Sequence, residues 1–351
     1  MSRGGFLLRG RWFYASLLVI VTMAYGWLIV NGLRRTHELT MGQSAPEAVE
    51  ATPATWQTEI HRDRVIKALK ERPGLAVVIG LWSSVAIGLG VSGLMMSWSI
   101  AVTRKLPPIF DAPAAALPVW KLGELVRIVL LVAFVLALLP FIHVSLTAWS
   151  SVQFADDHLW SLVAMLVLEG WFVLVVWAFA AGKSRGLLDL LGISRRSAPR
   201  AIRQGLAGYA AVFPWIFGLL WAVVRVCQAI GLEPPVEEIH KLLFGQQGPV
   251  VLGLTLVLAC VVGPVVEELF FRGLLFAALR SRTSKWVAIL ASGALFALVH
   301  TNVVGFVPIM ALGCFLAALY ERTGSLLSPI AVHIMHNTLL VSIGLSVKEL
   351  L

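Results

Sequence analysis

Two adjacent glutamates, Glu267 and Glu268, lie in the middle of a long apolar stretch, and Arg272 follows four residues after the second. The other charged residues between Gly248 and Val347 are Arg280, Arg282, Lys285, Glu321 and Arg322. An ionisable side chain at membrane depth costs roughly 2.5 to 3.5 kcal/mol on insertion scales. Three of them so close together therefore indicate a reaction or a transport path.

Helical spacing predicts different roles for the two glutamates. Glu268 and Arg272 are four residues apart and share a face, so we expect a charge pair that holds the helix geometry. Glu267 is rotated from that face by about 100°, which leaves it as the free acid.

Three more polar residues stand at positions that can meet Glu267. If a helix runs from near Gly248 to Arg280 and the chain turns at residues 281–284, Glu267 and His300 lie about equally far from the turn, roughly 25 Å along antiparallel helices. His333 and Asn337 are four apart on the last apolar segment and supply another polar face. One acid, two imidazoles and one amide form a set suited to hydrolysis.

The composition indicates that lipid surrounds these residues. Hydrophobic residues make up 58% of the chain, charged residues 13%, and the mean hydropathy is +0.85. Lipid offers no partners to unpaired backbone groups, so helices are the expected spanning elements. We predict an all-α, polytopic membrane bundle of about nine transmembrane helices, at residues 12–33, 74–102, 123–148, 158–182, 205–230, 248–279, 286–302, 304–321 and 327–347.

Basic residues in short loops predict the orientation. Two connections are rich in basic residues and are therefore predicted to be cytoplasmic, which places the N-terminus inside. The first connection contains Arg104, Lys105 and Lys121, and the second contains Lys183, Arg185, Arg195, Arg196, Arg200 and Arg203. Residues 34–73 are basic yet fall outside in this count, and residues 55–71 have the pattern of an interfacial helix. The net charge of +9 fits an anionic membrane leaflet, and because the basic residues are dispersed we expect no nucleic-acid partner.

The chain divides near residue 204. We predict an N-terminal membrane region of about four spans at residues 1–182, a basic cytoplasmic linker at 183–204 and a catalytic helical core at 205–351. Glu169, in the fourth span, is predicted to pair with a neighbouring helix or to stay neutral, because no second acid or spaced histidine accompanies it. His336 is predicted to be a satisfied core or cavity histidine.

Three motifs in order carry a resemblance to a known family. The run Glu267-Glu268-Leu-Phe-Phe-Arg272, then Phe296 with His300, then His333 with Asn337, resembles the motifs of the CAAX prenyl protease and bacteriocin-processing (CPBP, or Abi) family of intramembrane proteases. The resemblance covers about residues 185–351. It implies an integral, multi-pass protein of the bacterial cytoplasmic membrane that hydrolyses a peptide bond near the cytosolic side, in a peptide or membrane-protein substrate that can be prenylated.

The same resemblance implies a role for each site residue. Glu267 would be the general base that activates water, with His300 helping to hold the water or a metal. His333 and Asn337 would polarise the scissile carbonyl and stabilise its oxyanion. The family is labelled metalloprotease, and Glu267, His300 and His333 can supply a carboxylate and two imidazoles to zinc. The same three residues can also position water unaided, so the sequence leaves a metal open.

Two other classes of function use the same residues. A proton-coupled transporter can employ Glu267, His300 and His333 as a relay, although the chain shows no internal repeat and no pair of broken helices. A non-catalytic immunity or scaffold protein can be built on the protease fold, although the complete residue set favours an enzyme.

Overall fold

The computed structural model describes residues 10–42, 67, 69–105, 120–149, 157–181, 183, 188, 197–231, 248–300 and 304–348. In these residues every regular element is helical. The helices ahead of the site are α2 (Arg11–Gly42), α4 (Pro73–Thr103), α5 (Leu122–Trp149), α6 (Asp157–Ala181) and α8 (Ala198–Ala229). The later ones are α13 (Lys285–Val299), α14 (Phe306–Thr323) and α15 (Leu327–Lys348), preceded by a long helix that runs from Pro249 to Arg280.

That long helix consists of three α-helical segments separated by two stretches of π-helix. The segments are α10 (Pro249–Val257), η2 (Leu258–Val262), α11 (Gly263–Glu268), η3 (Leu269–Phe276) and α12 (Ala277–Arg280). The predicted helix from near Gly248 to Arg280 is therefore present, but its π-helical stretches were not expected. They flank the short segment that carries Glu267 and Glu268, and π-helical turns inside α-helices often occur at functional sites.

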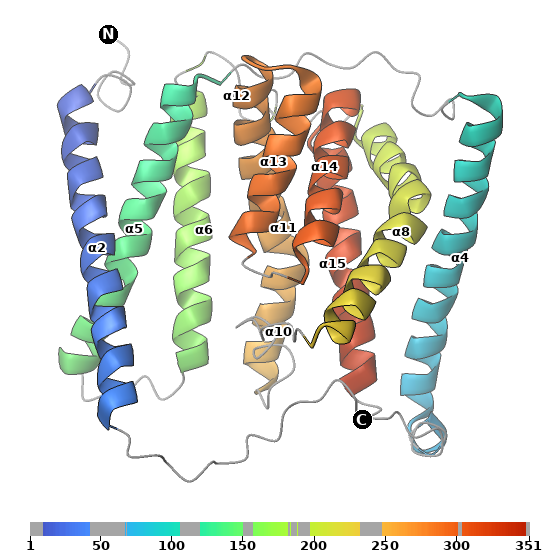
Figure 1. Ribbon diagram of the computed structural model, residues 1–351, viewed down its shortest axis with the longest axis horizontal. Helices are drawn as coiled ribbons and strands as arrows, with labels where there is room; N and C mark the ends of the chain where they lie inside the picture. Colours follow the sequence, from blue (N-terminus) through green and yellow to red (C-terminus); the bar gives the residue numbers. More distant parts are fainter. Residues whose placement is uncertain are drawn as a thin grey trace.

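The prediction of an all-α multi-span protein is confirmed, with eight rather than nine helices of crossing length in the described residues. The difference is α13, which has 15 residues. At 1.5 Å per residue it is about 22 Å long, shorter than the roughly 30 Å hydrocarbon core of a bilayer. Figure 1 shows α13 and α14 as a hairpin that enters the bundle from one end and turns back part of the way through it.

Local sequence signals explain where several helices begin and end. Pro73 and Pro249 stand at the first positions of their helices, where a missing N–H is tolerated. The Ser284 hydroxyl caps α13 by accepting a hydrogen bond from the Val287 N–H. Gly324 ends α14 in the left-handed conformation, with φ of 62°, which favours glycine.

Helices from both halves of the chain share one hydrophobic core. Buried side chains of α2, α5 and α6 form a single cluster with those of η3, α13 and α14, and examples are Tyr14, Ile128, Phe172, Phe276 and Tyr320. A second cluster joins α8 to α14 and α15. The division near residue 204 stays a prediction, although α8 begins at Ala198 and residues 198–204 are thus helical.

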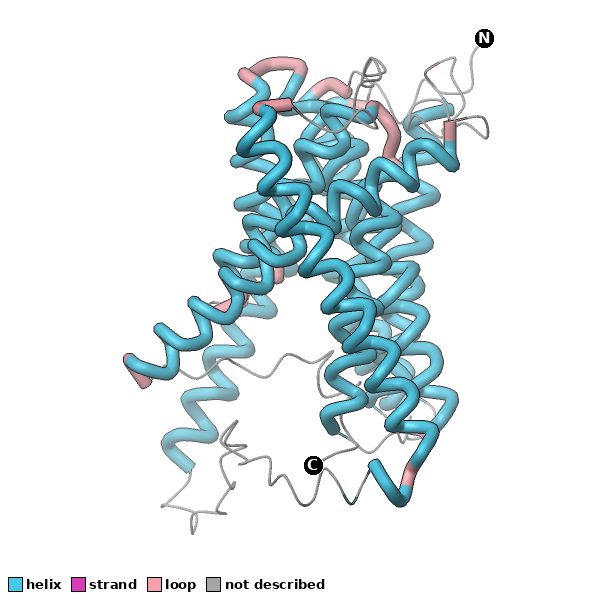
Figure 2. Tube along the Cα trace, turned by 90° about the vertical axis from the view of Figure 1, so that its right-hand side faces the viewer, coloured by secondary structure: helices cyan, strands magenta, loops and turns pink. Residues whose placement is uncertain are grey.

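The helix ends that carry the basic residues gather at one side of the bundle. The upper end of the bundle in Figure 1 contains the last turn of α4, the first turns of α5 and α8, and the turn between α12 and α13. There Lys183 pairs with Glu124 at 2.7 Å, and Arg280 pairs with Glu321 at 2.9 Å. The helices lie close together at this end and separate into two groups toward the other (Figure 2). The structure does not describe residues 43–66 and 68, which include most of the predicted interfacial helix, nor Arg185, Arg195 and Arg196.

Candidate active site

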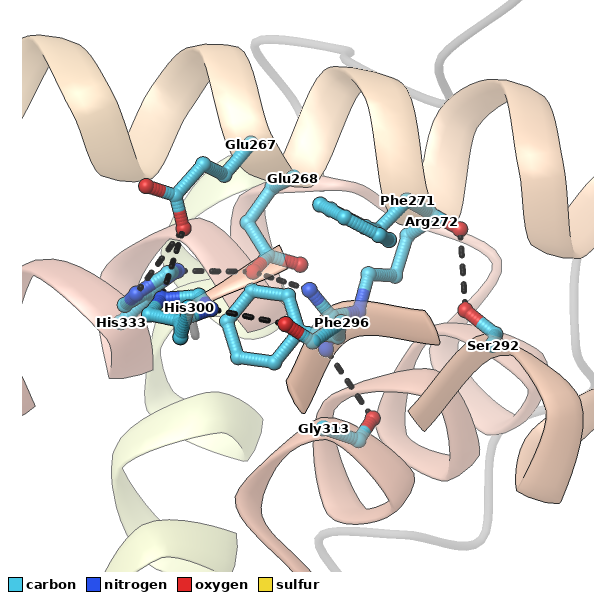
Figure 3. A network of polar contacts seen from close by, with 9 residues as sticks. All are labelled: Glu267, Glu268, Phe271, Arg272, Ser292, Phe296, His300, Gly313 and His333. Carbon is cyan, nitrogen blue, oxygen red and sulfur yellow. Dashed lines mark hydrogen bonds and ion pairs between the residues drawn. The ribbon is translucent and has the colours of Figure 1, made fainter. Parts of the chain in front are cut away.

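Glu267, His300 and His333 meet inside the bundle, although they come from three different elements. Figure 3 shows Glu267 of α11 pointing toward His300, which ends α13, and toward His333 of α15. The Oε2 atom of Glu267 lies 3.9 Å from Nε2 of His300 and 3.7 Å from Nε2 of His333. The structure thus brings together the carboxyl group and the two imidazoles that were predicted from the sequence to meet.

The depth of these residues follows from their distance to the α12–α13 turn. Glu267 stands 13 residues before the end of the helix at Arg280, and His300 stands 15 residues after Lys285. At 1.5 Å per residue both lie about 20 Å from that turn. The two side chains therefore share one level within the apolar part of the bundle.

Both histidines are oriented by the hydrogen bond of their other ring nitrogen. Nδ1 of His300 lies 2.7 Å from the carbonyl oxygen of Phe296, and Nδ1 of His333 lies 2.8 Å from Oε1 of Glu268. A carbonyl and a carboxylate only accept, so each Nδ1 must donate a proton. Each Nε2 is thereby directed at Glu267, and in the neutral form of the ring it carries a lone pair.

The predicted pair of Glu268 and Arg272 is formed and holds the site from behind. Arg272 donates to Oε1 of Glu268 at 2.7 Å and to the carbonyl of Gly313 at 3.0 Å. Both charged side chains are 0% exposed. The guanidinium also lies 4.5 Å from the ring centre of Phe296, whose ring contacts His300. One cation therefore links the long helix to α14 and, through Glu268, to His333.

Asn337 is attached to the long helix by its side-chain amide. It stands one turn after His333, and its Nδ2 donates to the carbonyl oxygen of Ala259 at 2.9 Å. Ala259 lies in η2, where the shift to π-helical hydrogen bonds leaves carbonyl groups free to accept from a side chain. This contact fixes Asn337 beside the catalytic segment, and its role toward a substrate stays a prediction.

His336 has the partner that a buried histidine requires. Its Nδ1 lies 2.8 Å from the hydroxyl of Tyr209 on α8, and both side chains are buried. Their contact ties α15 to α8 next to the site. The prediction of a satisfied core histidine is confirmed.

Removing that hydroxyl should therefore affect stability and not the reaction. In Tyr209→Phe the buried ring nitrogen of His336 loses its partner, which costs about 1 to 3 kcal/mol of unfolding free energy. Denaturant unfolding in mixed micelles measures the change, and Tyr25→Phe in α2 controls for the loss of a hydroxyl elsewhere. A Tyr209→Phe protein of unchanged stability would contradict this assignment.

The sequence missed one acidic residue next to the site. Glu169 of α6 has Oε1 at 3.9 Å from the point where a side chain on Gly263 would begin, and Oε1 of Glu267 lies 3.8 Å from the same point. No spacing in the sequence connects residues 169 and 267. Its place in the sequence was a usable signal, since Glu169 is a carboxyl group near the middle of a helix long enough to cross a membrane.

Two of the candidate metal ligands, His300 and His333, share one feature with the histidines of known metal sites. Metal-bound histidines usually donate their second ring N–H to a carbonyl or carboxylate, as His300 and His333 do. Within the described part of the chain, however, no group of three His, Cys, Asp or Glu residues is placed so that it can hold a metal ion. The sequence left a metal open, and the mechanism below assigns roles to side chains alone.

Comparisons with known proteins match the segment that holds the site. The family described as Type II CAAX prenyl endopeptidase Rce1-like matches residues 249–339. The Bacillus subtilis (strain 168) protein named "Putative membrane peptidase YdiL" is 36% identical over 88 residues, which are 25% of this chain and 36% of that protein. No solved structure matches the chain.

The family match contains all six of the predicted site residues, namely Glu267, Glu268, Arg272, His300, His333 and Asn337. Helices α2 to α8 lie outside it, and the chain spans about a third of the length of the curated relative. Residues 249–339 are therefore similar to the Rce1-like CAAX prenyl endopeptidases, in agreement with the resemblance that the three sequence motifs carry.

Proposed function

We propose that this protein is an intramembrane endopeptidase that hydrolyses a peptide bond on the side of the α12–α13 turn, the predicted cytosolic side. The observation that carries the proposal is the carboxylate oxygen Oε2 of Glu267, which faces two imidazole nitrogens within 4 Å inside a membrane bundle. The family of its C-terminal helices supports peptide hydrolysis as the reaction.

Glu267 is the general base in this mechanism. Its Oε2 has no hydrogen-bond partner among the described residues, and both Nε2 atoms are too far away for a direct hydrogen bond. A substrate water placed there can donate one proton to Oε2 and a lone pair of His300 Nε2 can accept the other hydrogen. As the water oxygen attacks the scissile carbonyl carbon, Glu267 takes its proton.

The same proton completes the reaction. Attack produces a tetrahedral intermediate whose former carbonyl oxygen is negative. When the C–N bond breaks, Glu267 returns the proton to the leaving nitrogen, and the products are a carboxylic acid and an amine. A single acid thus serves first as base and then as acid, as microscopic reversibility requires.

His333 and Asn337 are the proposed donors to the oxyanion. Since Nδ1 of His333 already donates to Glu268, its Nε2 can donate only when the ring is the imidazolium. Glu268 and Glu267 stand on its two sides and stabilise that positive charge. One preorganised donor to an oxyanion lowers the barrier by roughly 3 to 4 kcal/mol.

The substrate is proposed to be a peptide or membrane-protein segment that enters from the bilayer, with a prenylated tail as one candidate because of the family's description. The proposed setting is the bacterial cytoplasmic membrane. The protein reconstituted in proteoliposomes should cleave a set of membrane-anchored peptides with and without a prenyl group. Proton-coupled flux without any cleaved product would instead identify a transporter.

We also expect proteolysis to survive the removal of divalent metals. The three candidate ligands are not arranged as a metal site, and Glu267 has the position to activate water directly. The measurement is the cleavage rate of protein treated with a chelator and checked by elemental analysis. A loss of cleavage that zinc restores would overturn the expectation and assign Glu267, His300 and His333 as ligands.

A further inference from the structure

Glu169 lies in the first half of the chain, outside the segment that matches the family. It stands near the middle of α6, whose residues Leu159–Ala181 are apolar and long enough to cross a membrane. A carboxyl group at such depth is costly unless it has a function or a partner.

The group that Glu169 faces is Glu267. The Oε1 atoms of both side chains lie within 4 Å of one point above Gly263, at 3.9 Å and 3.8 Å. Gly263 has no side chain to stand between them. The two Oε1 atoms are therefore less than 8 Å apart, beside the helical turn that precedes Glu267.

The two oxygens of Glu267 consequently have different surroundings. Oε2 is the atom nearest His300 and His333, whereas Oε1 is on the side of Gly263 and Glu169. Oε2 of Glu169 is buried and has no hydrogen-bond partner in the described part of the chain. Glu169 therefore retains the capacity for a further hydrogen bond.

The position of Glu169 is fixed by packing on either side of it along α6. Leu162 forms a buried cluster with Val251 and Leu258 of the long helix. One turn beyond Glu169, the ring of Phe172 meets that of Phe270 edge to face at 5.9 Å between centres. Neither the rotation nor the level of α6 against α11 is free to change.

Electrostatics decides the form in which Glu169 is present. Two carboxylates this close at low dielectric repel each other, which favours the protonated form of one of them. Arg272 is bound to Glu268 and Gly313, so its charge is directed mainly at Glu268 and not at this pair of carboxyl groups. The ionisable residues of the adjacent helix α5, Glu124, Arg127 and His143, stand toward its ends.

The shared proton belongs on Glu169. Glu267 lies beside Nε2 of His333, and the imidazolium form proposed for that ring favours the negative charge of Glu267, whereas Glu169 forms no ion pair with a histidine among the described residues. A protonated carboxyl group is a hydrogen-bond donor, and Oε1 of Glu267 is an acceptor near the same point above Gly263.

We propose that Glu169 is a positioning residue of the active site, which as a carboxylic acid donates a hydrogen bond, directly or through one water, to Oε1 of Glu267. This bond holds the Glu267 carboxylate with Oε2 toward His300 and His333. The inference rests on the proposed peptidase function. It also gives the N-terminal helices a task, because without α6 the catalytic acid loses its orienting partner.

The test compares Glu169→Gln, which keeps a donor of nearly the same size, with Glu169→Leu, which keeps the size and removes the donor. We expect Glu169→Leu to lower kcat by up to about 100-fold with little change in KM, as misplacement of a reacting group does. Glu169→Gln should restore most of that kcat. Leu166→Ala, at an exposed position one turn away on α6, is the matched control for a disturbance of the helix.

Each other pattern overturns the inference. Equal activity of Glu169→Leu and wild type would make Glu169 a packing residue, and equal loss in Glu169→Leu and Glu169→Gln would make it an ionised carboxylate. A Glu169→Leu protein that fails to fold leaves the Gln variant and infrared spectroscopy as the test. The difference spectrum between wild type and Glu169→Gln should contain the C=O band of a protonated carboxyl group, and its absence would refute the proposal.

The infrared measurement does not depend on proteolysis. If wild type cleaves no peptide, the proposed function fails while the carboxyl band still reports on Glu169. If wild type cleaves and Glu267→Gln does not, the function stands and the Glu169 variants are judged by themselves.

Discussion

Glu267→Gln is expected to lower kcat for peptide cleavage by about 10²- to 10⁴-fold, the usual contribution of a general base. Glutamine has nearly the same size and keeps the packing of α11, but its amide cannot take a proton from water. The loss should appear in kcat and not in KM, because Oε2 acts on the attacking water and not on the bound peptide. Steady-state cleavage in proteoliposomes measures both constants.

The matched control is Glu321→Gln. Glu321 also carries a carboxylate on a membrane helix, but it pairs with Arg280 at the end of the bundle, far from the histidines. Its replacement should leave kcat unchanged. Full activity of Glu267→Gln, with the protein folded, would remove the basis of the proposed mechanism.

Arg272→Met is expected to be the most destabilising single change near the site. Arg272 and Glu268 are both 0% exposed, so removing the cation leaves a buried carboxylate without its charge partner. Breaking a buried pair in this way costs about 3 to 5 kcal/mol. The hydrogen bond to Gly313 and the contact with the Phe296 ring are lost as well. Denaturant unfolding in mixed micelles gives the free-energy change.

Two comparisons separate charge from packing. Arg280→Met removes an arginine from a partly exposed pair at the helix end, where such pairs contribute about 0 to 1 kcal/mol. The double variant Glu268→Gln, Arg272→Met should regain part of the lost stability, since no unpaired charge remains. Equal destabilisation by Arg272→Met and Arg280→Met would show that the buried pair has no special weight.

Features that depend on one helix at a time were predictable from the sequence. The pair of Glu268 and Arg272 follows from a spacing of four residues, and the common level of Glu267 and His300 follows from counting residues on both sides of one turn. The rise and the period of a helix are set by its own backbone hydrogen bonds. Depth in the membrane and the direction of a side chain around the axis are therefore countable.

Features that depend on neighbouring helices were not predictable. The π-helical segments, the hydrogen bond from Asn337 to the carbonyl of Ala259 and the short length of α13 all arise where helices fit against one another. A hydropathy profile also treats α13 as one more crossing, because it records composition and not where a hairpin turns back.

The sequence alone determined that this is a helical membrane protein with one acid and one histidine at a common depth and a second histidine on the last apolar segment. Only the tertiary structure decided that Glu169 lies beside Glu267 and that the N-terminal helices reach the site. The physical reason is that a helix fixes its own rise and rotation locally, whereas its lateral neighbours are selected by side-chain packing between segments far apart in the chain.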